Sequence, residues 1–114
     1  MPIEAVVFDL YGTLIYLAHE TKPYVNLFVD LGLDAYFDQV LFSCEAGLMK
    51  PDPRIYQRMM VMLNVEPQKA LMTGDKIKND VEGPRSIGMH AVHLDRENNS
   101  AWSIATLDQI FDYL

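Results

Sequence analysis

The chain has 114 residues, of which 50% are hydrophobic and 22% charged, and this balance excludes an intrinsically disordered protein. With 16 acidic and 9 basic residues the formal net charge is -7, which argues against nucleic acid as a partner. The single cysteine excludes an internal disulfide bond, and every apolar run is far shorter than the ~20 residues needed to span a bilayer. We therefore expect one cytoplasmic domain over residues 1–114, with no signal peptide and no membrane partner.

Four short apolar runs without helical periodicity predict the buried strands of a parallel sheet. Charged residues, glycine or proline bound each run, and the runs occupy residues 3–9, 39–43, 70–73 and 90–94. Apolar residues recur at helical spacing in four other segments, at residues 22–31, 53–64, 79–86 and 106–114. Strands that alternate with helices predict an α/β fold whose polar chemistry lies at the carboxyl ends of the strands.

The segment after Asp52 carries the strongest helix signals. Asp52 is a typical N-cap residue, Pro53 suits the first helical position, and the apolar pattern ends at Asn64. The predicted buried faces are Ile55, Met59, Met62 and Leu63 in this helix, and Leu107, Ile110, Phe111 and Leu114 in the C-terminal one.

Polar clusters follow three of the predicted strands, and a parallel sheet would gather them at one edge. Asp9 ends the first strand and is a candidate nucleophile or metal ligand. Asp75 and Asp80 offer the hard oxygen ligands that Mg²⁺ prefers, and Lys50 adds a compact positive charge. Each cluster also has a purely structural interpretation: a turn at Gly74-Asp75, a helix cap at Asp80, and a helix entry at residues 50–53.

Three segments, VVFDLYGTL, FDQVLFSCEAGLMKPDPRIY and MTGDKIKNDVEGPRSIGM, together resemble the haloacid dehalogenase superfamily of hydrolases in order and spacing. The resemblance covers the first 14 residues and nearly all of residues 31–94, and the subgroup with a helical cap domain is the most similar in style. It implies a three-layer Rossmann-like core with a mostly parallel sheet. Residues 1–14 would form the nucleophile strand and loop, residues 15–38 a shortened region in place of the cap and second motif, and residues 39–114 the remainder of the core.

The resemblance also implies roles for individual residues. Asp9 would attack the substrate and form a covalent aspartyl intermediate, while Lys50 would hold the nucleophile and the charge of the transferred group. The substrate would be a small phosphorylated molecule and the cofactor Mg²⁺. The implied metal ligands are Asp9, the backbone carbonyl of Tyr11, Asp75 and Asp80, and the implied substrate-binding residues are Gly12, Thr13, Thr21 and Lys50. Thr21 is equally well interpreted as the N-cap of a following helix.

Two features depart from the family pattern. Phosphatases of the family carry a second Asp two residues after the nucleophile, and this chain has Tyr11, as metal-independent 2-haloacid dehalogenases do. In addition, Thr21 comes only eight positions after Thr13, which leaves no room for a cap at that point. Three interpretations therefore remain: a weak Mg²⁺-dependent phosphatase, a metal-independent dehalogenase, or an inactive truncated core that forms a homo-oligomer through an unpaired sheet edge.

Overall fold

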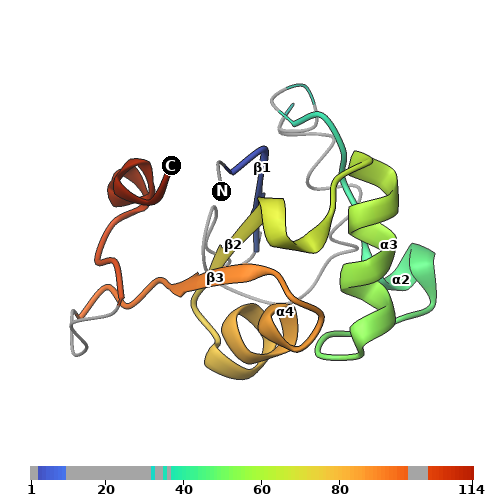
Figure 1. Ribbon diagram of the computed structural model, residues 1–114. Helices are drawn as coiled ribbons and strands as arrows, with labels where there is room; N and C mark the ends of the chain where they lie inside the picture. The colour runs from blue at the N-terminus through green and yellow to red at the C-terminus, as the bar shows by residue number, and fades with distance from the viewer. Residues whose placement is uncertain (1–2, 10–31, 33–34, 36, 98–102) are drawn as a thin grey trace.

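The computed structural model describes residues 3–9, 32, 35, 37–97 and 103–114. A three-stranded parallel sheet lies at its centre, in the order β1-β2-β3 (Figure 1). The strands are β1 (Ala5–Phe8), β2 (Ala70–Gly74) and β3 (His90–His93). The helical elements are α2 (Ser43–Ala46), α3 (Pro53–Leu63), η2 (Pro67–Lys69), η3 (Lys78–Glu82), α4 (Gly83–Ser86) and η4 (Leu107–Tyr113). The α/β fold and three of the four predicted strands are confirmed.

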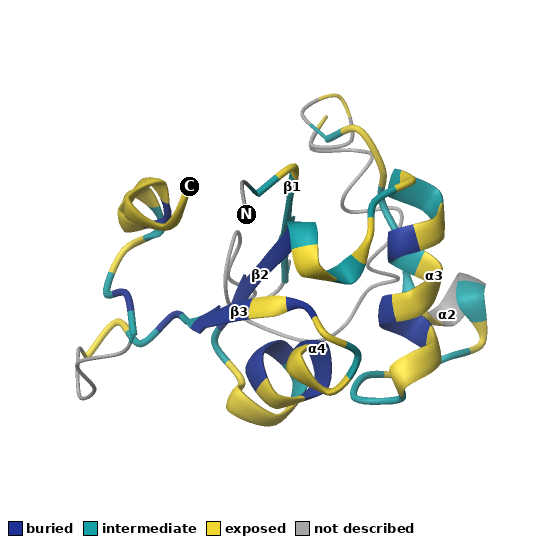
Figure 2. Cartoon of the chain, in the orientation of Figure 1, coloured by how far each residue is buried: buried dark blue, intermediate teal, exposed yellow. Residues whose placement is uncertain are grey.

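The central strand, β2, is buried along its whole length (Figure 2). Ala70 pairs with Ala5 of β1, and Leu71 pairs with His90 of β3. A strand that is covered on both faces needs no alternation of polar and apolar residues. This burial explains why the sequence shows an apolar run there rather than a period of two.

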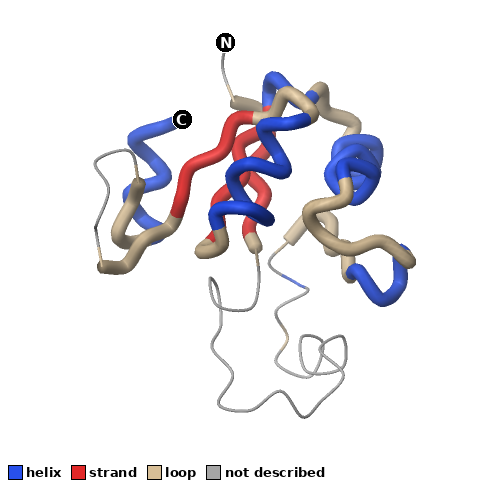
Figure 3. Tube along the Cα trace, turned by 90° about the horizontal axis from the view of Figure 1, so that it is seen from below, coloured by secondary structure: helices blue, strands red, loops and turns tan. Residues whose placement is uncertain are grey.

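Two apolar clusters pack on opposite faces of the sheet. Met72 of β2 packs with Ile55 and Tyr56 of α3 on one face. Leu71 packs with Ile110 of η4 on the other face. Because successive residues of a strand point to opposite faces, β2 contributes to both cores, and the chain forms three layers with the sheet in the middle (Figure 3). Within the described part of the chain, none of the helices combines the length and the apolar character that crossing a membrane requires.

Helix α3 begins and ends where the sequence predicts. The side chain of Asp52 accepts a hydrogen bond from the N–H of Arg54 at 3.0 Å, and Pro53 occupies the first turn. Asn64 adopts the left-handed conformation with φ of 54° and ends the helix. The buried face is shifted from the predicted one: Ile55, Tyr56 and Met60 are buried, whereas Met59, Met62 and Leu63 are only partly covered.

The strand predicted at residues 39–43 is wrong. No described strand includes these residues, and Ser43 instead begins the short helix α2. Phe42 is extended, with φ of -103° and ψ of 135°, but it serves as the N-cap of this helix. Gly47, with φ of 70°, ends α2 in the left-handed conformation. A glycine at that spacing is a helix C-cap signal, which the preceding apolar run obscured.

The C-terminal helix is present as the 3₁₀ helix η4 and not as an α-helix. The N–H of Thr106 donates to the side-chain oxygen of Gln109 at 3.1 Å and closes its first turn. Ile110 is buried as predicted, but Phe111 is 73% exposed and Leu114 57% exposed, so that part of the predicted stripe is wrong. A 3₁₀ helix has three residues per turn, and a stripe drawn for 3.6 residues per turn therefore includes residues that face solvent.

The helix predicted at residues 79–86 is found as two consecutive elements, the π-helix η3 and the α-helix α4. Pro84 lies in the first turn of α4, where its missing N–H is tolerated. The helix predicted at residues 22–31 lies outside the described residues.

Candidate active site

Asp9 and Asp75 lie at the carboxyl edge of the sheet because each directly follows a strand. The N–H of Asp9 donates to the carbonyl oxygen of Thr73 at 3.0 Å, which continues the β1-β2 ladder past the end of β1. On the other side of β2, the N–H of Leu94 donates to the carbonyl oxygen of Gly74 at 2.8 Å. The backbone on both sides of these carboxylates is therefore fixed by the sheet.

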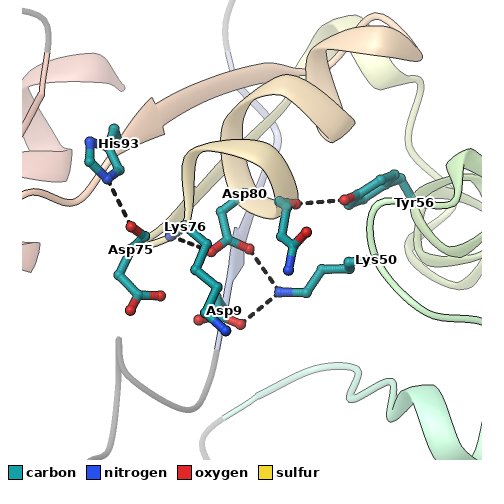
Figure 4. A network of polar contacts seen from close by, with 8 residues as sticks. Asp9, Lys50, Tyr56, Asp75, Lys76, Asp80 and His93 are labelled. Atoms are coloured by element: carbon teal, nitrogen blue, oxygen red, sulfur yellow. Dashed lines mark hydrogen bonds and ion pairs between the residues drawn. The ribbon is translucent and has the colours of Figure 1, made fainter.

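Lys50 reaches this edge from the loop between α2 and α3. Its ammonium nitrogen lies 2.7 Å from Oδ1 of Asp9 and 2.7 Å from Oδ1 of Asp80 (Figure 4). The side chain of Lys50 keeps 25% of its surface exposed, that of Asp9 keeps 15%, and that of Asp80 keeps none. One positive charge is thus shared between two carboxylates from different segments of the chain.

Asp80 lies in the π-helix η3, and its carboxylate folds back against the end of β2. Its Oδ2 accepts a hydrogen bond from the N–H of Lys76 at 3.0 Å. Its carboxylate lies so near Gly74 that a Cβ atom at position 74 would overlap it. The Gly74-Asp75 pair is therefore more than a turn, since its glycine makes room for a second, fully buried carboxylate.

The charges of the site shift two of its pKa values. Burial by itself lowers the pKa of Lys50, but the carboxylates of Asp80 and Asp9 outweigh burial and raise the pKa above its ordinary value. Burial raises the pKa of Asp80, and Lys50 and the N–H of Lys76 only partly oppose that rise. The two directions are compatible. Two carboxylates stabilise the charged form of Lys50, whereas the charged form of Asp80 has one cation, which it shares with the like charge of Asp9.

The carboxylates form a set that fits a divalent cation. One oxygen from each of Asp9, Asp75 and Asp80 lies within 4.8 Å of the others. Oδ1 of Asp75 is buried and has no hydrogen-bond partner among the described residues. A buried carboxylate oxygen without a donor is costly, and a cation ligated by oxygen would satisfy it. His93 fixes the backbone here, since its Nε2 lies 2.8 Å from the carbonyl oxygen of Asp75.

A cleft of about 950 Å³ opens beside Asp9 and Lys50. Asp9, Lys50, Lys76 and Asn79 lie on its polar wall, and apolar side chains of β1, β2 and α3 form much of the described remainder. A ligand that enters this cleft reaches the Asp9 carboxylate and the Lys50 ammonium together.

Four of the residues predicted for the site, Asp9, Lys50, Asp75 and Asp80, are brought together in the structure. Their catalytic and metal-binding roles stay predictions. The predicted residues Tyr11, Gly12, Thr13 and Thr21 lie outside the described part of the chain.

Two residues that contact the site were not singled out for it. His93 ends β3 at the same sheet edge, so its position after an apolar run was the available signal. Tyr56 had no such signal, because it lies among the apolar residues of α3 and its hydroxyl reaches Asn79 only through the packing of α3 against α4, the helix that directly follows η3.

Comparisons with known proteins agree with this fold. The family model described as "Hydrolase: haloacid dehalogenase-like hydrolase" matches residues 20–88. A phosphoserine phosphatase of Thermus thermophilus is 43% identical over 68 residues, which are 60% of this chain and 27% of that protein. The chain spans about a quarter of the length of the curated relatives it matches.

Solved structures show the same core. A HAD phosphatase from Thermococcus onnurineus has a TM-score of 0.72 and 33% identity, with 81% of this chain and 46% of that chain covered. A 2-haloacid dehalogenase from Pseudomonas syringae pv. tomato has a TM-score of 0.69 and 27% identity, with 75% of this chain and 40% of that chain covered. Because the family model matches more than half of its residues, the chain belongs to the haloacid dehalogenase-like hydrolases.

Proposed function

We propose that the chain acts as a Mg²⁺-dependent phosphatase on a small phosphoric monoester. The observation that carries this proposal is the position of the Lys50 ammonium, 2.7 Å from both Asp9 and Asp80. It is joined by the buried Oδ1 atom of Asp75, which has no hydrogen-bond partner among the described residues. Phosphoryl transfer depends on positioning and on charge neutralisation, and this edge of the sheet offers both. The similarity to a phosphoserine phosphatase and to a HAD phosphatase supports the same reaction class.

In the proposed first step, a carboxylate oxygen of Asp9 attacks the phosphorus of the substrate. The new oxygen–phosphorus bond forms as the bond to the ester oxygen breaks, and the departing alkoxide takes up a proton from solvent water. In the second step, water attacks the phosphorus of the aspartyl phosphate, which releases inorganic phosphate and restores the Asp9 carboxylate. Lys50 keeps Asp9 oriented and offsets negative charge on the transferred group.

Mg²⁺ would be held by Asp9, Asp75 and Asp80, and the family resemblance adds the backbone carbonyl of Tyr11. When bound, it would neutralise charge on the phosphoryl group and on the three carboxylates. This chain's contribution is to hold their oxygens within 4.8 Å of one another and to exclude water from Asp80. We assign contacts with the substrate phosphate to Gly12, Thr13 and Thr21, together with Lys50.

Tyr11 is expected to make this phosphatase slow. The family's phosphatases use a carboxylate there as general acid and base, and a phenol with an ordinary pKa of ~10 transfers protons poorly near neutral pH. Losing such a catalyst typically costs on the order of 10²- to 10⁴-fold in rate. Tyr11→Asp should therefore raise kcat for a phosphate ester, and an unchanged or lower kcat would show that position 11 does not limit turnover.

The test of the function is phosphate release from a generic aryl phosphate. We expect turnover that requires Mg²⁺, stops with a chelator, and disappears in Asp9→Asn. Asp112→Asn is the matched control, because it removes an exposed carboxylate from η4, far from β1 in the chain, and should keep full activity. Turnover that persists in the chelator or in Asp9→Asn would refute the proposal.

A metal-independent dehalogenase is the rival function. It is favoured by Tyr11 and by the similarity to a 2-haloacid dehalogenase, whereas the set of three clustered carboxylates favours the metal-dependent reaction. Halide release from a 2-haloacid in excess chelator would establish the rival. Absence of both activities, together with self-association in light scattering, would instead identify an inactive core.

A further inference from the structure

A buried tyrosine of α3 contacts the backbone of the turn that carries Asp80. Tyr56 is 3% exposed, and its hydroxyl donates a hydrogen bond of 2.6 Å to the carbonyl oxygen of Asn79 (Figure 4). Asn79 directly precedes Asp80 in the π-helix η3. The phenol is therefore one residue away from a carboxylate of the candidate active site without touching that carboxylate.

The π-helical turn leaves the Asn79 carbonyl in need of this donor. In an α-helix, the N–H of Gly83 would bond to the oxygen of Asn79, but here it bonds to Lys78. The next residue that a π-helical pattern would use is Pro84, which has no N–H. The hydroxyl of Tyr56 supplies the hydrogen bond that the backbone around Gly83 and Pro84 does not.

A glycine makes this approach sterically feasible. A Cβ atom at Gly83 would overlap the hydroxyl of Tyr56. Gly83 has φ of -58°, a conformation that any residue adopts, so its missing side chain serves the contact and not the backbone. Gly74 plays the same role on the other side, where it leaves room for the Asp80 carboxylate. Two glycines thus make room for close contacts around η3, Gly74 for the Asp80 carboxylate and Gly83 for the Tyr56 hydroxyl.

We propose that Tyr56 is a positioning residue, whose hydroxyl holds η3 so that the Asp80 carboxylate stays directed at Lys50 and at the N–H of Lys76. Its effect on turnover rests on the proposed phosphatase function, whereas its effect on the position of Asp80 does not. Burial first, and the charge of Asp80 second, raise the pKa of the Tyr56 phenol. The hydroxyl accordingly keeps its proton and remains a donor near neutral pH.

The test replaces only the hydroxyl, with Tyr56→Phe, and follows the amide of Lys76 by hydrogen exchange and NMR. That N–H donates to Oδ2 of Asp80 at 3.0 Å and reports directly on the carboxylate. We expect its protection to fall about fivefold, the equivalent of one ordinary hydrogen bond, and its chemical shift to change. The amide of Met72 in the buried strand β2 should keep its protection.

Tyr113→Phe is the matched control, since it removes a phenol hydroxyl from a half-exposed position in η4 and should leave the Lys76 amide unchanged. Gly83→Ala is the second variant, and we expect the displaced phenol to change the Lys76 amide at least as much. An unaltered Lys76 amide in Tyr56→Phe, or an equal loss of protection at Lys76 and Met72, would overturn the proposal, because the hydroxyl would then have no role or only a general structural one.

Turnover supplies a second readout. If the phosphatase function holds, Tyr56→Phe should lower kcat with little change in KM, because the hydroxyl that is removed bonds to the carbonyl oxygen of Asn79 and is not assigned to substrate binding. If the wild-type protein releases no phosphate, the proposed function fails while the Lys76 amide still decides the role of Tyr56.

Discussion

Lys50 and Asp80 form an ion pair in which the ammonium lies 2.7 Å from a carboxylate with no exposed surface. Among the described residues, the Asp80 carboxylate accepts one other hydrogen bond, from the N–H of Lys76. Its charge is tolerated inside the fold because Lys50 is there, and the two residues therefore stabilise the protein as a unit.

Removal of Lys50 alone should accordingly destabilise the protein. For Lys50→Met we expect a loss of about 2–4 kcal/mol in the free energy of unfolding, at or below the usual range for a broken buried pair, because the Lys50 side chain is partly exposed. Urea unfolding measures it. The double variant Lys50→Met with Asp80→Asn should recover more than half of the loss, since no unpaired charge remains at position 80; a double variant as unstable as Lys50→Met would contradict the coupling.

Gly74→Ala should disturb the site without straining the backbone, because Gly74 is an ordinary strand residue and its missing Cβ serves only to admit the Asp80 carboxylate. We expect a loss of about 1–3 kcal/mol in stability from overpacking. In an Asp80→Ala background the same substitution should cost much less, because the overlapping carboxylate is gone. Equal costs in both backgrounds, measured by thermal or urea unfolding, would show that Asp80 is not what position 74 accommodates.

Asp52 should make part of the stability dependent on pH. Hydrogen bonds from the Arg54 side chain, and then from its backbone N–H, lower the pKa of Asp52 from 3.8 to about 2. A lowered pKa in the folded state favours folding above the unfolded value, and this contribution disappears as the pH falls from 3.8 to about 2. Asp52→Asn keeps an acceptor at the N-cap but loses the charge.

We therefore expect the wild-type protein to be more stable than Asp52→Asn near neutral pH, with the difference in the free energy of unfolding shrinking below the ordinary pKa of Asp52. Urea unfolding across this pH range measures both proteins. A difference that stays constant, or that grows as the pH falls, would show that the Asp52 carboxylate is not stabilised by Arg54 in the folded state.

Mg²⁺ should stabilise the folded protein if the three carboxylates hold it. At 100 times its Kd, a ligand that binds only the folded state adds about 2.7 kcal/mol, and each kcal/mol raises the Tm of a domain this size by roughly 4–8 °C. Asp75→Asn should lose most of this rise, and Asp112→Asn should keep it. A further rise in Tm that requires Mg²⁺ and beryllium fluoride together would support binding of a phosphoryl group at Asp9. No rise in Tm with Mg²⁺ would contradict the proposed metal site.

The parts of the fold that local chemistry decides were predictable from the sequence. Asp52, Pro53 and Asn64 mark the ends of α3 through capping, and the apolar run that became β2 is buried on both faces. The segment at residues 39–43 was not predictable in the same way, because an apolar run leaves open whether its end pairs with a strand or turns into a helix. In this case Gly47 decided for the helix α2.

The candidate site was likewise predictable only in part. Asp9, Lys50, Asp75 and Asp80 could be proposed because each follows a predicted strand or matches a family segment. The network that joins them could not be predicted, because the sharing of Lys50 between Asp9 and Asp80 depends on how η3 folds back on β2. The contribution of Tyr56 was also hidden, since it requires a π-helical turn, and no sequence period distinguishes such a turn from an α-helix.

The ion pairs of Lys50 also bear on the order in which the protein folds. Lys50 lies 41 positions along the chain from Asp9 and 30 positions from Asp80, so both contacts close long loops. Contacts this distant in sequence carry an entropic cost that local helical turns avoid, so α3 can begin to form well before they do. Lys50 meets Asp9 only when β1 has docked beside β2. Recovery of the proposed phosphatase activity during refolding should consequently mark the completion of the sheet, later than the return of the helical signal.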